Sequence, residues 1–116
     1  MNTEIDLLKF ERSSGNLQWL PAAATAFLLQ LPRWHIDFDA AMKAQDCTQQ
    51  NDLLHKMKGA CYAVAAYKAA DAIAWGETQQ GCNKEIFLSG LAGQLALVEA
   101  ELQMFLLTLL TRQPEH

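Results

Sequence analysis

The amino-acid sequence predicts an all-α fold: an antiparallel up-and-down four-helix bundle with a short extra helix at the N-terminus. Hydrophobic residues make up 51% of the 116 residues and charged residues 19%, with only six glycines and three prolines. Apolar residues recur at steps of three and four along long segments, which is the spacing of amphipathic helices. Short connections between such segments favour antiparallel neighbours. A chain of this length forms one hydrophobic core, so residues 1–116 are expected to be a single domain.

The N-terminal half contains a short helical pattern and then a long one. We expect a helix over residues 5–12, followed by a polar turn that Asn16 could cap. Pro21 suits the first position of the next helix. Pro32 lies within that helix, so a kink or a break is expected there. One face of the helix carries the predicted core residues Phe27, Leu31, Trp34, Phe38 and Ala41.

The third predicted helix follows a polar connection at residues 46–50. At about 100° per residue, six apolar side chains fall within an arc of roughly 120°. They are Leu53, Leu54, Met57, Ala60, Cys61 and Val64. His55 projects roughly 160° from the centre of this stripe, with Lys58, Gly59 and Tyr62 within about 60° of it. We therefore expect the imidazole to face solvent or the edge of a neighbouring helix.

The two last helices differ in how clearly the sequence marks them. A helix from Tyr67 to Gln79, closed by Gly81, follows a weakly marked turn, because no glycine or proline precedes it. The final helix has apolar residues at alternating steps of three and four. They are Leu88, Leu91, Leu95, Val98, Leu102, Phe105 and Leu109. We expect this stripe to pack inside the domain and the protein to be a monomer.

Composition excludes several classes of function. A net charge of −4 lacks the basic surface of a nucleic-acid-binding protein. The longest uninterrupted apolar run falls short of the ~20 residues of a membrane span, and no signal-peptide pattern is present, so we expect a cytoplasmic protein without a membrane partner. Cys47, Cys61 and Cys82 are odd in number and widely spaced, which predicts neither a disulfide framework nor a zinc site. With three scattered histidines, no metal or other cofactor is expected.

One helical patch combines an imidazole, a cation and a position without a side chain. His55, Lys58 and Gly59 are three and four residues apart and so share a face. Glycine inside a helix costs about 0.5–1 kcal/mol relative to alanine. Either a close helix crossing or the close approach of a partner would explain it. We favour a partner that carries a phosphoryl group.

The string His55-Lys56-Met57-Lys58-Gly59-Ala60 resembles the signature of the histidine-containing phosphotransfer (HPt) domain family. The resemblance covers roughly residues 27–77. Upstream it includes Phe27-Leu28, Leu31-Pro32, Phe38, Ala40-Ala41-Met42 and Asp46. Downstream, Glu77 stands 22 residues after His55, where the family often has Gln or Glu. The chain departs from the family at Ala65-Ala66, which replaces a common Gly-Ala pair, and at the bulky Tyr62.

The resemblance implies that His55 accepts and donates a phosphoryl group in a phosphorelay. Glu77 would then hold the proton on Nδ1 of the ring, and Lys58 would offset the charge of the phosphoryl oxygens. Lys56, Gly59 and Tyr62 would meet the partner, a response-regulator receiver domain or a hybrid histidine kinase. The receiver would bring the aspartate and Mg²⁺.

Two further expectations limit this hypothesis. The sequence has no G-x-x-x-x-G-K nucleotide loop, so the chain would carry phosphate without a kinase ATP site of its own. The alternative is a non-catalytic helical adaptor, a degenerate HPt domain that binds receivers without phosphotransfer. Phosphotransfer requires that the His55 ring stand outward and that Gly59 remain uncovered.

Overall fold

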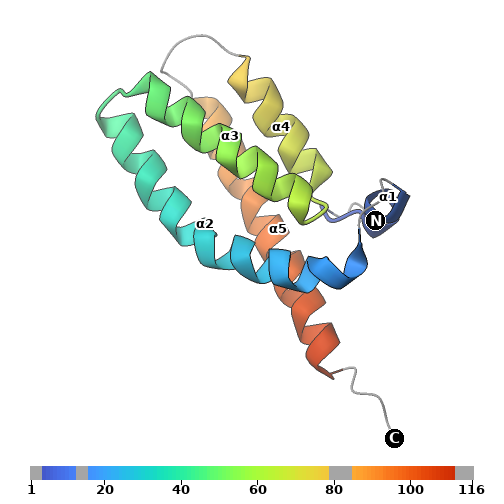
Figure 1. Ribbon diagram of the computed structural model, residues 1–116. Coiled ribbons are helices and arrows are strands. Elements are labelled where there is room, and N and C mark those ends of the chain that lie inside the picture. The colour runs from blue at the N-terminus through green and yellow to red at the C-terminus, as the bar shows by residue number, and fades with distance from the viewer. Residues whose placement is uncertain (1–3, 13–15, 79–84, 112–116) are drawn as a thin grey trace, which may run out of the picture.

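The computed structural model describes residues 4–12, 16–78 and 85–111, with side chains in the last range from residue 90 onward. Every element in these residues is a helix. The helices are α1 (Leu7–Arg12), the 3₁₀ helix η1 (Leu17–Trp19), α2 (Leu20–Lys43), α3 (Cys47–Ala63), α4 (Tyr67–Glu77) and α5 (Glu85–Thr111). α3 packs between α2 and α4, and α5 contacts both α2 and α4 (Figure 1). The predicted all-α class is confirmed, and the arrangement is compatible with a four-helix bundle preceded by a short helix.

The long helix α2 is the first of the core helices. Asn16 accepts a hydrogen bond from the backbone N–H of Gln18 and caps η1, and Pro21 occupies the first turn of α2 as predicted. The predicted core residues of α2 are all buried. α2 continues through Pro32 without a break, so of the two outcomes expected there the break is wrong. The ribbon bends near the middle of the helix (Figure 1), which agrees with the lost hydrogen bond at a proline.

α3 and α4 form the hairpin that carries the predicted site. Asp46 caps α3 by accepting a hydrogen bond from the backbone N–H of Gln49 at 3.0 Å. Five residues of the predicted α3 stripe are buried and Ala60 is half-buried, so this prediction is confirmed. The turn to α4 is fully buried, and Ala65 adopts φ 63° there. An alanine in this left-handed conformation explains why no glycine marked the turn in the sequence.

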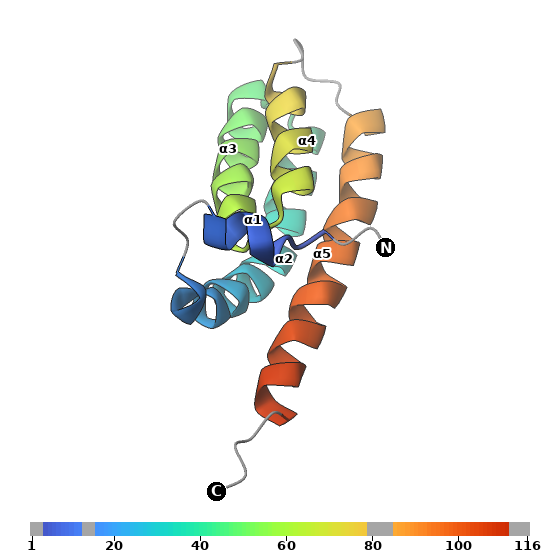
Figure 2. The same ribbon diagram turned by 90° about the vertical axis from the view of Figure 1, so that its right-hand side faces the viewer.

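The two ends of α4 and α5 differ from the sequence expectations. α4 ends at Glu77, whereas the predicted end at Gln79 and the closing Gly81 lie outside the described residues. In α5, the predicted core stripe is buried at Leu91, Leu95, Val98 and Leu102. Phe105 is half-buried and Leu109 is 41% exposed, so the expectation that this stripe packs inside the domain is confirmed from Leu91 to Leu102 and wrong at Leu109. Figures 1 and 2 show the reason, because the C-terminal part of α5 extends past the other helices.

The N-terminal segment ties α5 to the α3–α4 turn. The Glu101 carboxylate accepts hydrogen bonds from the backbone N–H groups of Glu4 and Ile5, at 2.7 and 3.0 Å. The backbone N–H of Asp6 donates to the carbonyl of Ala65 at 3.0 Å. Figure 2 shows α1 lying across the end of this hairpin.

Two features bear on the exclusions drawn from composition. Cys47 is disulfide-bonded, whereas the sequence predicted no disulfide; Cys82 lies outside the described residues. Within the described residues, the section Gly90–Thr111 of α5 is long and apolar enough to cross a membrane by length and composition. Its uninterrupted apolar run is shorter, because Glu99 and Glu101 lie within it.

The free thiol of Cys61 gives a test of the core. Burial, with a smaller contribution from the Glu4 carboxylate, raises the pKa of Cys61 from 9.0 to about 12. We expect iodoacetamide at pH 8 to alkylate Cys61 at least about 100-fold more slowly in the folded protein than in urea, as measured by peptide mass spectrometry without reductant. Because only the folded thiol keeps its proton between pH 9 and 12, this group should make the free energy of unfolding fall as pH rises through that range. Equal alkylation rates in the two states would contradict the buried placement.

Candidate functional site

The exposed face of α3 presents His55 outward. Leu54 and Met57, on the opposite face, are buried and fix the rotation of the helix. The His55 side chain is 73% exposed. The first requirement of the phosphotransfer hypothesis, an imidazole that is not enclosed, is therefore met.

Glu77 lies beside this imidazole at the C-terminal end of α4. Its Oε2 is 3.5 Å from Nδ1 of His55, and its side chain is 23% exposed. The contact lies at the outer limit of hydrogen-bonding distance. With Nδ1 facing the carboxylate, Nε2 is left as the ring nitrogen for chemistry. The structure thus brings together two of the three residues predicted as catalytic.

Lys58 completes this cluster from the next turn of α3. Its Nζ lies 2.7 Å from Oε1 of Glu77, and its side chain is 25% exposed. The negative end of the α4 dipole disfavours a carboxylate at the last residue of the helix. The Lys58 ammonium offsets this cost, and a protonated His55 would do so as well. Glu77 therefore bridges the two α3 side chains.

Gly59 stands open beside the cluster. A Cβ placed on Gly59 would meet no atom within 4 Å outside the local helix backbone, and the residue is exposed. A close crossing by a neighbouring helix is thereby excluded as the reason for this glycine. The second requirement of the phosphotransfer hypothesis, an uncovered glycine, is also met.

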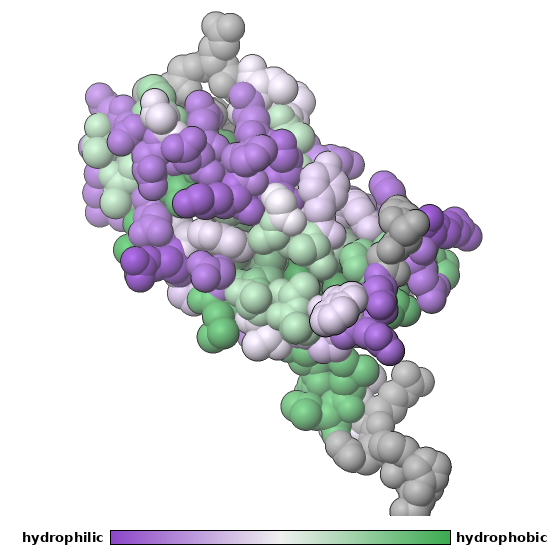
Figure 3. All heavy atoms as spheres, viewed as in Figure 1, coloured by the Kyte–Doolittle hydropathy of each residue, from purple (hydrophilic) through white to green (hydrophobic). Residues whose placement is uncertain are grey.

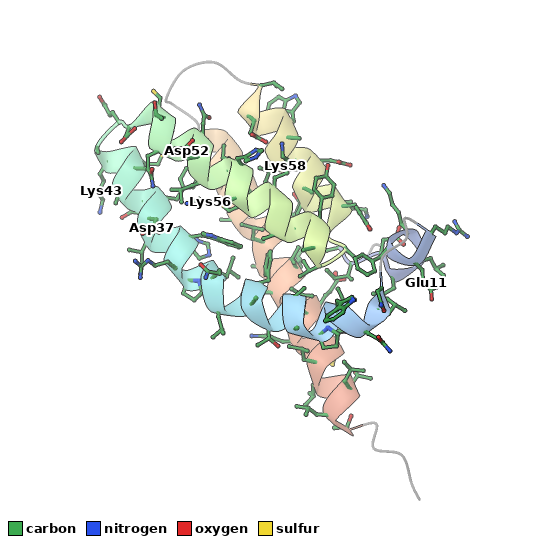
Figure 4. All side chains as sticks on the ribbon, in the orientation of Figure 1. Glu11, Asp37, Lys43, Asp52, Lys56 and Lys58 are labelled. Atoms are coloured by element: carbon green, nitrogen blue, oxygen red, sulfur yellow. The ribbon has the colours of Figure 1, made fainter. Side chains whose placement is uncertain are left out.

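The other two predicted partner contacts lie on different sides of α3. Figure 4 shows Lys58 on the side of α3 that faces α4 and Lys56 on the side nearer α2. Tyr62 is 42% exposed, and its hydroxyl donates a hydrogen bond to Oδ1 of Asp71 on α4 at 3.4 Å. The centroid of its ring lies 6.1 Å from the ring centroid of Tyr67. Tyr62 is thus held at the α3–α4 junction, whereas Lys56 is a separate exposed cation.

Sequence reasoning missed two exposed residues of α4, Asp71 and Trp75. Trp75 is 58% exposed. Asp71 had no predicted role and contacts Tyr62. Asp71 and Trp75 are four residues apart and so share one face of α4, but only the register of α4 against α3 brings Asp71 to Tyr62.

The arrangement suits a nucleophile better than a metal centre. Among the residues described, no group of three or more His, Cys, Asp or Glu side chains is placed to hold a metal ion. One exposed imidazole with a carboxylate at Nδ1 and a nearby ammonium can accept an anionic group at Nε2.

Comparison with known proteins identifies no relative of this chain. No protein-family model, curated protein or solved structure matches the chain. The site is therefore assigned from its own residues alone.

The open space at Gly59 predicts that alanine is tolerated there. Replacing Gly59 with Ala should raise the free energy of unfolding by about 0.5–1 kcal/mol, because alanine loses less backbone freedom in a helix. Urea denaturation followed by circular dichroism measures this change. The control is Gly90→Ala, at another exposed helical glycine with open space, which should give a similar gain. A loss of stability at Gly59 but not at Gly90 would contradict the open geometry.

Proposed function

We propose that this chain is a cytoplasmic phosphorelay carrier of the histidine-containing phosphotransfer type, built as an antiparallel four-helix bundle. The single observation that carries the proposal is the cluster of His55, Lys58 and Glu77 on the exposed face of the α3–α4 hairpin. The resemblance of residues 55–60 to the family signature supports the same assignment. The partner is a receiver domain, alone or within a hybrid histidine kinase.

The proposed step is the transfer of a phosphoryl group from a receiver aspartyl phosphate to Nε2 of His55. The N–P bond forms as the acyl phosphate P–O bond breaks, and the aspartate leaves as a carboxylate. The proton of the neutral ring stays on Nδ1, where Glu77 stabilises the cationic character that the ring gains. The receiver supplies Mg²⁺, and the reverse step passes the phosphate to a second receiver.

Lys58 and Gly59 serve the same step without bonding to phosphorus. The Lys58 ammonium balances the Glu77 carboxylate before transfer, and it would attract the phosphoryl oxygens afterwards, since it and the His55 ring contact the same carboxylate. Gly59 leaves space for the receiver loops around its aspartate. Lys56 and Tyr62 lie on either side of this approach and contact the receiver surface.

A transfer assay tests the proposal. Incubation with a phosphorylated receiver domain should label the wild-type chain with acid-labile, base-stable phosphate, and His55→Gln should abolish the label. His35→Gln is the matched control, because His35 is an exposed histidine on α2 and should be dispensable. Equal labelling of wild type and His55→Gln would overturn the assignment. Receiver binding with no phosphate uptake by wild type would instead establish the adaptor function.

The carboxylate of Glu77 predicts a graded effect on transfer. Glu77→Ala should slow phosphoryl transfer to His55 by about 100-fold, because it removes the group that orients the ring and holds its proton. Glu77→Gln should be intermediate, since its amide oxygen still accepts from Nδ1–H. Rapid-quench kinetics over pH 5.5–8.5 measures both, with Lys68→Ala, at an exposed position of the same helix, as the control. An unchanged rate and pH profile for Glu77→Ala would rule out this role.

A further inference from the structure

The outer face of α5 carries a second stripe of residues spaced for helix pairing. Counting from Leu97, exposed residues follow at alternating steps of three and four: Ala100, Met104, Leu107 and Thr111. Leu97, Met104 and Leu107 are 57%, 62% and 53% exposed. The Thr111 hydroxyl already bonds to the carbonyls of Leu107 and Thr108, so its methyl group remains to make contacts. A solvated helix face normally carries charges, and this stripe carries none.

Beyond Leu102, α5 has no neighbouring helix over it in the described part of the chain. Leu102 is the last fully buried residue of the inner stripe, and α5 continues past the other helices (Figure 1). Figure 3 shows that this projecting part is almost entirely hydrophobic. A mostly apolar hollow of about 400 Å³ lies beside it, and it is lined by Met104 of the stripe and by Glu101, together with Ile5, Leu7 and Phe105. A two-fold interface uses the same patch on both copies, so the exposed stripe around Met104 of one copy can enter the hollow of the other.

From this surface we infer that α5 pairs with α5 of a second copy of this chain, antiparallel and about a two-fold axis near Met104. The distribution of charged residues on α5 favours a second copy over a lipid surface. From Leu102 to Thr111 the helix has no charged residue, and between Glu85 and Thr111 it has no Lys or Arg. An anionic lipid surface attracts basic residues, which this helix lacks. A membrane span would bury Glu99 and Glu101 near its centre and would separate Val98 and Leu102 from the core.

Charge also selects the orientation. In a parallel pair the two Glu99 residues, and likewise the two Glu101 residues, would lie at the same level along the helix axes. In an antiparallel pair centred on Met104, the two Glu99 residues lie about 15 Å apart along the axis, at 1.5 Å per residue. That separation exceeds the Debye length of about 8 Å at physiological ionic strength. The Glu101 carboxylate already accepts hydrogen bonds from the backbone N–H groups of Glu4 and Ile5 in its own chain. The uncharged segments therefore meet without like-charge contact.

Sedimentation equilibrium over micromolar to near-millimolar concentrations tests the inference on the full chain. Wild type should pass from monomer to dimer, and Met104→Glu should weaken association at least about 100-fold, because like charges would meet at the axis. Leu29→Glu is the matched control, since Leu29 is 75% exposed on α2, and it should dimerise like wild type. Circular dichroism checks that each variant stays helical.

Mixing two variants of opposite charge provides the decisive experiment. Met104→Glu and Met104→Lys should each be monomeric alone and should form a heterodimer when mixed, because the opposite charges then meet. Wild type that stays monomeric throughout, or dimers that persist in Met104→Glu, would overturn the inference. So would wild-type monomers that bind vesicles of phosphatidylcholine and phosphatidylglycerol, an outcome that would assign the face to lipid. Phosphotransfer by His55 is independent of all these outcomes.

Discussion

The Glu77 carboxylate, held between the Lys58 ammonium and the His55 imidazole, is the interaction on which the proposed site depends. It exists only because α4 returns along α3 in one register. The buried turn at residues 64–66 sets that register, and the hydrogen bond from Asp6 to the Ala65 carbonyl fastens the turn to the N-terminal segment. A left-handed alanine and a carboxylate at the negative end of a helix are both locally unfavourable. The packing of the hairpin and the Lys58 ion pair compensate for them.

Helical periodicity was enough to predict most of the core. The apolar stripes of α2 and α3 are buried where the spacing of apolar residues placed them, because the rotation of an amphipathic helix follows from which face must leave water. The outward direction of His55 followed from the same geometry. The end of the buried stripe in α5 could not be predicted this way. Periodicity shows which face is apolar, but the lengths of the neighbouring helices decide how far that face is covered.

The site was only partly accessible from the sequence. The resemblance at residues 55–60 selected His55, Lys58 and Gly59, and the offset of Glu77 selected the carboxylate. The ion pair between Lys58 and Glu77 depends on the register of two helices, and no local pattern encodes it. The Asp71 contact to Tyr62 has the same origin. The disulfide at Cys47 was missed because cysteine spacing alone does not show which thiols meet in space.

In the proposed mechanism, Glu77 holds the Nδ1 side of His55 and leaves Nε2 free to take phosphate. The most direct measurement is ¹⁵N–³¹P correlation NMR on the ¹⁵N-histidine-labelled chain after phosphorylation with phosphoramidate. We expect one phosphorus resonance coupled to Nε2 of His55. Coupling to Nδ1 of His55, or to His35, would contradict it.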